Sequence, residues 1–352
     1  MRQLRSAENS RRELVLKWPV SIRIGLKAMV ASLVMCGVIV GIATLSLMAG
    51  TMQVSVADVL RALNGQAEGI IHTVVVEWRL PRAIAAIVFG AGLGVSGAIF
   101  QSLTKNPLGS PDIIGFSSGS YTGALLVLLG TGSISFIAVA SGAIVGGIGT
   151  AILVYVLAFR GGSKGFRLII VGIAISAMLS SVNSILLLRG EAGAAFTAAA
   201  WGIGSLNEVS REQVTPASIM VIVIIATAML QSRPLREMEL GDDTARAHGV
   251  SVEKSRILLM ATAVALTAIP TAVMGPATFV ALAAPQMAKR VAGASRSLFP
   301  AAAMGALLLL GADFIAQRLI RGTILPVGAV TLSLGGLYLV WLLFMQARRK
   351  PL

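Results

Sequence analysis

Charged side chains are scarce in this sequence of 352 residues: Asp, Glu, Lys and Arg make up 12% of it, and 56% of its residues are hydrophobic. An ordinary soluble domain carries about 25% charged residues, so this chain has too few to cover a surface in water. It also has one cysteine and two histidines. Cys36 alone excludes an intramolecular disulfide and a cysteine-based metal cluster. His72 and His248 are far apart, so we expect no protein-borne metal centre.

Motifs for nucleotide binding and for acid–base catalysis are also missing from the sequence. The nearest cluster of glycine and lysine, at 161–165, lacks the spacing of a phosphate-binding loop and the hydroxyl residue that follows its lysine. Paired carboxylates within the apolar runs are absent as well. We therefore expect no enzyme activity, no ATP binding of this kind and no cofactor on this chain.

Basic residues outnumber acidic ones by 29 to 15. They stand in short clusters between apolar runs, without a basic face or interleaved aromatic residues, so we do not expect a nucleic-acid partner. Seven of them fall in residues 1–27, before the first apolar run. No small-residue cleavage signature follows that run, so we interpret it as a retained span rather than a removed signal peptide.

Apolar runs long enough to cross a bilayer recur along the chain. About 20 apolar residues cross a hydrocarbon core of about 30 Å, and single crossings fit 28–48, 83–104, 168–188, 214–232, 298–317 and 324–345. Residues 113–159 are too long for one helix, and Gly130-Thr-Gly-Ser133 supplies the turn of a hairpin. Residues 257–288 carry Gly275-Pro276 and have basic residues on both flanks, which favours a second hairpin. The sequence therefore predicts an all-α protein of ten transmembrane helices.

The distribution of Lys and Arg predicts how these helices are oriented. Of the 29 basic residues, 22 fall in the termini and loops of one predicted side and seven on the other, and an excess of basic residues marks the cytoplasmic side. We therefore predict a multi-pass protein of the inner membrane. It comprises a basic cytoplasmic segment at 1–27, one transmembrane domain at 28–346 and a basic cytoplasmic tail at 347–352.

Small and polar residues inside the spans predict how the helices pack. Small residues at one-turn spacing let backbones approach closely in lipid, and they occur at Gly90, Gly94 and Gly97, at Gly142 and Gly146, and at Gly172, Ser176 and Ser180. Asn183 predicts an interhelical hydrogen bond. Asp313 is the only ionisable residue well inside a predicted span, a position that suggests function by default. Its place near the outer boundary favours a structural pairing with Arg318 or Arg321.

Four arginines on the predicted outer side depart from the charge bias together. Arg79 and Arg82 flank Pro81 at the second span, and Arg318 and Arg321 precede the tenth. Their long side chains either reach lipid phosphates and helix ends or form a cationic rim for an acidic partner or substrate, because a guanidinium group binds carboxylates through two bonds. The residues alone leave both interpretations open.

The largest predicted cytoplasmic loop, 231–256, carries signals for a short helix. Asp242 or Asp243 can cap its start, residues 244–248 can form the helical turn, and Gly249 can end it in the left-handed conformation. We interpret the segment as a surface helix that is either plain loop structure or the contact for an energy-coupling partner.

Seven ordered stretches carry a resemblance to a known family: Glu77-Trp-Arg-Leu-Pro-Arg82, Gly94-Val-Ser-Gly-Ala-Ile-Phe-Gln-Ser102, Asn106-Pro-Leu-Gly-Ser-Pro111, Trp201-Gly-Ile-Gly-Ser-Leu206, Leu240 to Val250, Pro285-Gln-Met-Ala-Lys-Arg290 and Leu325-Pro-Val-Gly328. From about residue 30 onward the chain resembles the FecCD family, the permease subunits of bacterial type II ABC importers for ferric siderophores, haem and cobalamin. Glu77-Trp78 and Gly109-Ser-Pro-Asp112 look most similar to the subunits that carry ferric enterobactin.

The resemblance implies a machine of several chains. Two permease subunits, here favoured as a heterodimer, stand on two ABC ATPase subunits, which bind ATP and magnesium. A periplasmic or lipid-anchored siderophore-binding protein delivers the ferric siderophore. Iron stays ligated by the siderophore, so the resemblance implies no metal ligand on this chain.

The resemblance also assigns roles to residues of this sequence. It implies ATPase coupling at Leu240, Gly241, Asp242, Asp243, Ala245 and Gly249. It implies docking of the binding protein at Arg79, Arg82, Arg318 and Arg321. The fifth and tenth spans line the path in the family, which suggests Ser176, Ser180, Asn183, Ser333 and Gly335. Gln286 departs from the family, which often has histidine there, and the segment 1–27 has no clear counterpart.

Our leading hypothesis is a permease subunit that passes an intact ferric siderophore, driven by ATP on partner chains. One alternative keeps this machine and changes the cargo to haem or cobalamin. Another is a carrier driven by a proton or sodium gradient, which the scarcity of buried acids disfavours. A third is a membrane scaffold that transports nothing.

Overall fold

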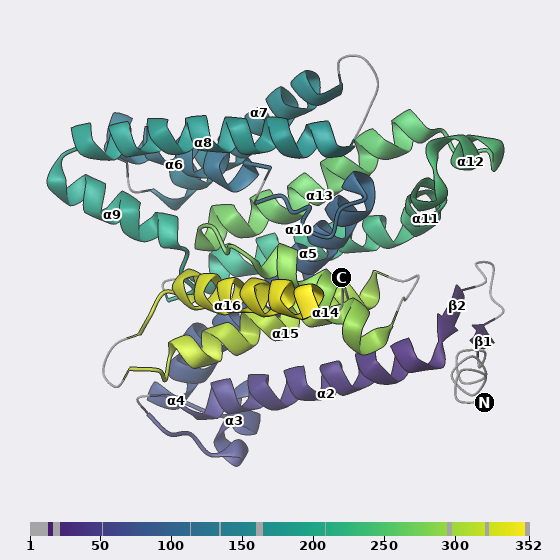
Figure 1. The fold of residues 1–352 in the computed structure, drawn as a ribbon. Coiled ribbons are helices and arrows are strands. Elements are labelled where there is room, and N and C mark those ends of the chain that lie inside the picture. The colour runs from purple at the N-terminus through teal and green to yellow at the C-terminus, as the bar shows by residue number, and fades with distance from the viewer. Residues whose placement is uncertain are drawn as a thin grey trace.

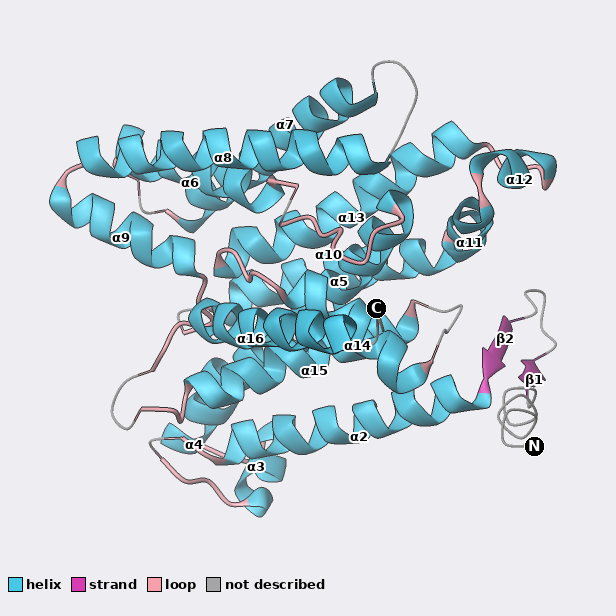
Figure 2. Cartoon of the chain, viewed as in Figure 1, coloured by secondary structure: helices cyan, strands magenta, loops and turns pink. Residues whose placement is uncertain are grey.

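The computed structural model describes residues 13–16, 22–50, 52–112, 114–133, 135–159, 165–207, 209–293, 298–320 and 324–348. Helices dominate this part of the chain (Figure 2). Two short antiparallel strands, β1 (Glu13–Leu16) and β2 (Ile22–Gly25), precede the first helix. The helices are, in order, α2 (Leu26–Met48), α3 (Val56–Leu63), α4 (Ile70–His72), the π-helical η1 (Thr73–Arg79), α5 (Leu80–Thr104), α6 (Phe116–Gly130), α7 (Phe136–Phe159), α8 (Gly165–Arg189), α9 (Ala192–Ile203), α10 (Arg211–Leu230), α11 (Ser232–Leu240), α12 (Asp242–Ala247), α13 (Val252–Met274), α14 (Val280–Ala292), α15 (Phe299–Ala316) and α16 (Val327–Arg348).

Helix α5 lies at the centre of the molecule. It packs against α10, α13, α14 and α15. In Figure 1, α6, α7 and α8 form a group on one side of it, and α2, α15 and α16 form a group on the other. Four of the largest fully buried side chains of the described residues lie on α5, at Phe89, Leu93, Ile99 and Phe100. In the outer helices α2, α8 and α10, less than a third of the apolar membrane-spanning stretch is buried inside the protein, as expected for helices that face lipid.

The connecting segments gather at two ends of the bundle. The strands β1 and β2 lie at the same end as α11 and α12, and the short helices α3, α4 and α9 lie at the opposite end (Figure 1). We refer to these as the α12 end and the α3 end. The sequence predicted the loop around α12 and the amino-terminal segment on one side; the described strands β1 and β2 lie at the α12 end, and the orientation of the termini in the membrane stays a prediction.

Helices occupy all six predicted single spans, and the segments 131–135 and 275–279 divide both predicted hairpins. Among the described residues, seven helices are long and apolar enough to cross a membrane: α2, the continuous run 70–104, α7, α8, α10, α13 and α15. Shorter apolar helices are α6, α9 and the first part of α16. The sequence assigned no helix to α9, because 12 residues at about 1.5 Å each fall short of a bilayer.

Glycines bring the backbones of neighbouring helices into contact. A Cβ atom built on Gly94 would lie 2.1 Å from the Ala301 carbonyl oxygen of α15, and one on Gly97 would lie 1.7 Å from the Ala281 carbonyl oxygen of α14. The same close approach joins α6 to α7, where a Cβ atom on Gly146 would lie 2.2 Å from the Gly119 carbonyl oxygen. The predicted packing positions are confirmed at these glycines.

We expect Gly94→Ala to destabilise the protein by about 1–3 kcal/mol, because the new methyl group overlaps the backbone of α15 and forces two tightly packed helices apart. The thermal unfolding midpoint of the purified protein in detergent measures the effect. Gly37→Ala is the matched control, since a Cβ atom on Gly37 of α2 would meet nothing within 4 Å. Equal midpoints for the two variants would contradict this account of the α5–α15 contact.

Candidate functional site

The α12 end carries a folded segment rather than an irregular loop. Helix α11 continues from α10 and buries Leu235 and Met238 against the core. Gly241, at a φ of 127°, breaks the chain direction between α11 and α12. Leu240 remains 69% exposed at this corner, so an apolar side chain faces away from the helix bundle.

Helix α12 ends as the sequence predicted. Gly249 has a φ of 80°, its N–H donates to the Arg246 carbonyl, and the Val250 N–H donates to the Ala245 carbonyl, both at 2.9 Å. This pair of bonds is the Schellman motif, which satisfies the last carbonyls of a helix. Ala245 is fully buried and packs with Val250, so the motif anchors α12 to the protein beneath it.

The start of α12 differs from the capping that the sequence predicted. Gly241 holds the capping position, and Asp242 and Asp243 lie in the first turn without a capping bond. Their carboxylates instead bind arginines: Asp242 accepts a bond from Arg256 at 2.7 Å, and Asp243 pairs with Arg246 at 2.9 Å. The carboxylates still lie near the positive end of the helix dipole.

Arg256 on α13 is a residue that sequence reasoning missed at this site. Its side chain is 8% exposed and binds both Asp242 and Glu253, which ties α12 to the long helix α13. His248 contacts Glu237 at 2.6 Å and so joins α12 to α11. The hydrogen bond with His248 lowers the pKa of the Glu237 carboxyl. The corner from 232 to 250 is therefore held to the bundle through several polar contacts.

At the α3 end, the predicted outer arginines bind the protein itself. Arg79 donates to the carbonyls of Leu47 and Met48, at 2.8 and 3.1 Å, and Arg318 donates to the Ala49 carbonyl at 2.6 Å. These carbonyls close the end of α2, where backbone acceptors lack intrahelical partners. Burial lowers the pKa of the Arg318 guanidinium. Arg321 lies outside the described residues.

The partner of Asp313 differs from the prediction. Asp313 is 1% exposed and pairs with Arg82 of α5 at 2.7 Å, rather than with Arg318; the predicted alternative, Arg321, lies outside the described residues. The Nε of Arg82 also donates to the same carboxylate, and Gln317 adds a further bond at 2.7 Å. Sequence spacing favoured near neighbours, whereas the contact of α5 with α15 brings together two residues far apart in the chain.

The residues predicted along a path lie on two separate helices. Ser176 of α8 shares a hydrogen bond with Ser118 at 3.0 Å, and Asn183 accepts one from Thr122 at 2.7 Å; both partners belong to α6, as the prediction of an interhelical bond required. Ser180 and Ser333 are exposed. Gly335 of α16 packs against the ring of Phe279. Within the described residues, α8 and α16 do not form a packed pair.

Gln286, where the sequence departs from the family pattern, has a defined place. Its Nε2 donates to Gln101 Oε1 at 2.5 Å and to the Pro107 carbonyl at 3.2 Å. Gln101 in turn donates to the Leu282 carbonyl at 3.0 Å. The two amides therefore fasten the loop after α5 to helix α14, a contact that sequence reasoning did not anticipate.

The same loop contains a buried carboxyl group, Asp112. Ser117 donates to it at 2.7 Å. Burial raises the pKa of Asp112 to about 6, which outweighs the opposing hydrogen bonds from Ser117 and the Phe279 backbone. Because the folded state then holds the proton more tightly than the unfolded state, the protein loses stability as the pH rises from about 4 to about 6.

We expect Asp112→Asn to remove this pH dependence and to stabilise the protein at pH 7.5 by up to about 3 kcal/mol, since an amide carries no charge to bury. Unfolding midpoints in detergent between pH 4 and pH 8 measure it. Asp243→Asn is the control, because that side chain is fully exposed. A slope between pH 4 and pH 6 that survives in Asp112→Asn would count against the assignment.

Comparison with known proteins identifies the family of this chain. The family model described as the FecCD transport family matches residues 36–345. The chain is 48% identical over 305 residues to the ferric enterobactin transport system permease protein FepG of Escherichia coli, covering 86% of this chain and 92% of that protein. It is 33% identical over 278 residues to the hemin transport system permease protein HmuU of Yersinia pestis, covering 77% and 83%.

A solved structure has the same fold. It is described as an inward-facing conformation of a metal-chelate type ABC transporter, with a TM-score of 0.79 and 26% sequence identity over 89% of this chain and 98% of that one. The family match at 36–345 includes α5, the corner around α12 and the four arginines proposed above, and the relatives each cover more than three quarters of the chain. The chain therefore belongs to the FecCD transport family.

Proposed function

We propose that this chain is the transmembrane permease subunit of an ATP-driven ABC importer that carries an intact ferric siderophore across the inner membrane. The observation that carries the proposal is the 48% identity to the ferric enterobactin permease over 86% of the chain. The proposal includes ten spans with both termini in the cytoplasm; the gathering of β1 and β2 at the α12 end supports a shared side for the amino-terminal segment and that corner.

The corner from 232 to 250 is the proposed contact for the ATPase. Its short helix α12 is anchored by Ala245 and Arg256, so a force on its surface moves α13 with it. Exposed Leu240 offers an apolar contact beside the charged groups of Asp243 and Arg246. ATP and magnesium belong to two partner ATPase subunits, and this chain needs no cofactor of its own.

The path for the siderophore is proposed to lie between this chain and a second permease subunit, in a heterodimer. The exposed serines Ser180 and Ser333 lie on α8 and α16, two helices that leave large faces open. A path formed by two subunits needs only half of its lining from each. This explains why the candidate residues can serve one path without contacting each other within one chain.

Uptake in proteoliposomes tests the function. The vesicles hold this chain, its partner permease and the ATPase, and they are supplied with the binding protein and ferric enterobactin. They should accumulate iron only when ATP is present on the side of the membrane that carries the ATPase. Uptake that ignores ATP and collapses with an ion gradient would refute the ABC assignment. Competition by hemin or cobalamin tests the cargo, and the hemin permease among the relatives makes hemin the informative competitor.

The same uptake assay tests the proposed role of Gly249 in ATPase coupling. Gly249→Val should lower uptake about fivefold or more while ATP hydrolysis continues, because a side chain in the left-handed conformation costs about 1 kcal/mol or more. Gly249→Asn is the control, since asparagine tolerates this conformation and nothing lies within 4 Å of the new Cβ atom. Normal uptake in Gly249→Val would contradict the coupling assignment.

The outer rim of Arg79, Arg82, Arg318 and Arg321 is proposed to dock the siderophore-binding protein, delivered from the periplasm or from a lipid anchor. Charge reversal at Arg82 would also break its buried pair with Asp313, at a cost of about 3–5 kcal/mol. The neutral double variant Arg82→Met with Asp313→Asn removes both charges together. It separates docking from stability, because replacing both members of a buried pair is nearly neutral.

We expect this double variant to unfold within a few degrees of the wild type and to bind the binding protein about tenfold more weakly, as the loss of one charge-assisted bond requires. Titration of the purified proteins at physiological salt measures the affinity. Arg61→Met is the control, because Arg61 is an exposed arginine of the same end. Unchanged affinity in the double variant would make the Arg82–Asp313 pair purely structural.

A further inference from the structure

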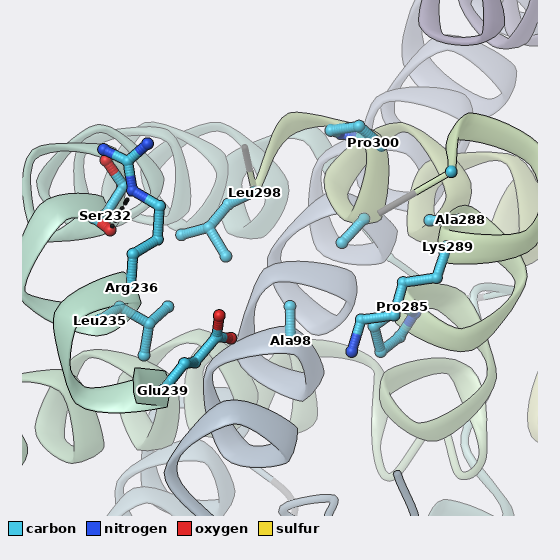
Figure 3. A pocket seen from close by; sticks show the side chains of 12 residues that line it. Ala98, Ser232, Leu235, Arg236, Glu239, Pro285, Ala288, Lys289, Leu298 and Pro300 are labelled. Carbon is cyan, nitrogen blue, oxygen red and sulfur yellow. Dashed lines mark hydrogen bonds between the residues drawn. The ribbon is translucent and has the colours of Figure 1, made fainter. Parts of the chain in front are cut away.

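A pocket of about 70 Å³ opens at the α12 end between four helices (Figure 3). Ala98 of α5 lies in the middle of it, Ser232 to Glu239 of α11 and Leu298 at the start of α15 lie on one side, and Pro285 and Lys289 of α14 lie on the other (Figure 3). Most of the lining is apolar, but three ionisable side chains reach it. The α11 side of the pocket belongs to the corner proposed to contact the ATPase, whereas the arginines of the α3 end and the path residues do not line it.

The ionisable groups of the pocket are of both signs and are not paired with each other. Glu239 and Lys289 reach into the space from opposite walls on either side of Ala98 (Figure 3). The described residues contain no ion pair between them. Glu239 accepts one bond, from Ser102 at 2.5 Å, and Arg236 donates from Nε to the Ser232 carbonyl. The carboxylate of Glu239 and the ammonium of Lys289 thus keep further bonding capacity toward the pocket, whereas the guanidinium of Arg236 is turned toward Ser232 (Figure 3).

The pocket lies at the depth of lipid headgroups. Ser232 stands two residues beyond the end of α10, and Leu298 stands one residue before the start of α15. Both helices are apolar spans, so their ends mark the edge of the hydrocarbon core. Leu230, at the end of α10, and Phe299, at the start of α15, are 80% and 48% exposed. They provide apolar surface beside the opening of the pocket.

Apolar residues of α5 on the membrane side of Ala98 are not fully covered. Helices α10 and α15 both pack on α5 but do not form a packed pair with each other. Beyond the fully buried Val95, the residues Ala91, Val88 and Ile84 of α5 are partly exposed. An acyl chain anchored by its headgroup at Ala98 would find an apolar surface there.

We propose that this pocket binds the headgroup of an aminophospholipid of the surrounding bilayer, with its phosphate at Lys289 and its ammonium at Glu239. A headgroup that carries both charges bridges the two walls that the protein leaves apart. A purely anionic headgroup would meet the carboxylate of Glu239 unfavourably, and a choline headgroup has no N–H to donate to it. The inference rests on the membrane location of the chain, not on its cargo.

Lipid binding to the delipidated protein in detergent tests the proposal, by native mass spectrometry and by the unfolding midpoint. Phosphatidylethanolamine should bind about tenfold more tightly than phosphatidylcholine of the same chains, the factor that corresponds to one bond between charged groups. Glu239→Gln, which keeps an acceptor for Ser102, should abolish this preference and leave the protein folded. Lys289→Ala should weaken both lipids.

The controls make each outcome decisive. Lys254→Ala removes an exposed cation of the same end outside the pocket and should leave the binding of both lipids unchanged. Equal binding of phosphatidylethanolamine, phosphatidylcholine and phosphatidylglycerol, or a preference that survives in Glu239→Gln, would overturn the proposal. Soluble phosphoethanolamine that protects the protein as well as the lipid does would overturn the assignment to a bilayer lipid.

Discussion

Close backbone contact around α5 is the constraint on which the other features depend. In lipid, the hydrophobic effect does not drive helices together, so their association depends on tight packing. Gly90 and Gly94 bring α5 against α15, and Gly97 brings it against α14. At this separation a methyl group has no room, so the three helices have one relative position. The buried pair of Arg82 and Asp313 is possible only because that position brings their side chains together.

The charges of the chain follow from the same packing. The spans have few ionisable residues, and the described ion pairs lie near the two ends, where helix termini expose backbone groups. Arg79 and Arg318 bind the carbonyls that end α2, and Arg256 binds the first turn of α12. Arginine suits these places because its several donors bind more than one acceptor at once. A structural role and a docking role are therefore compatible in one guanidinium group.

Span length and small-residue spacing predicted most of the fold, since both are local properties of the chain. Gly94, Gly146 and Gly249 have the roles that spacing and turn chemistry assigned to them. Contacts between distant segments were not predictable: Asp313 pairs with Arg82, and Gln286 bonds to Gln101. Helix α9 was not predicted because it is too short for a span. The predicted cap of α12 was wrong because Asp242 binds Arg256, a residue that lies outside the local capping pattern.

Helix α5 joins the two ends at which partners are proposed to bind. Arg82 stands near its first turn and holds α15 through Asp313. At its other end, Gln101 bonds to α14 and Ser102 bonds to Glu239 of α11. The 25 residues of α5 extend about 37 Å at 1.5 Å each, and glycine contacts fix the helix to α14 and α15 along the way. Arg82 at the α3 end and Ser102, which bonds to Glu239 at the α12 end, thus lie on the same helix, so a displacement of α11 by a partner would act on contacts that reach the α3 end.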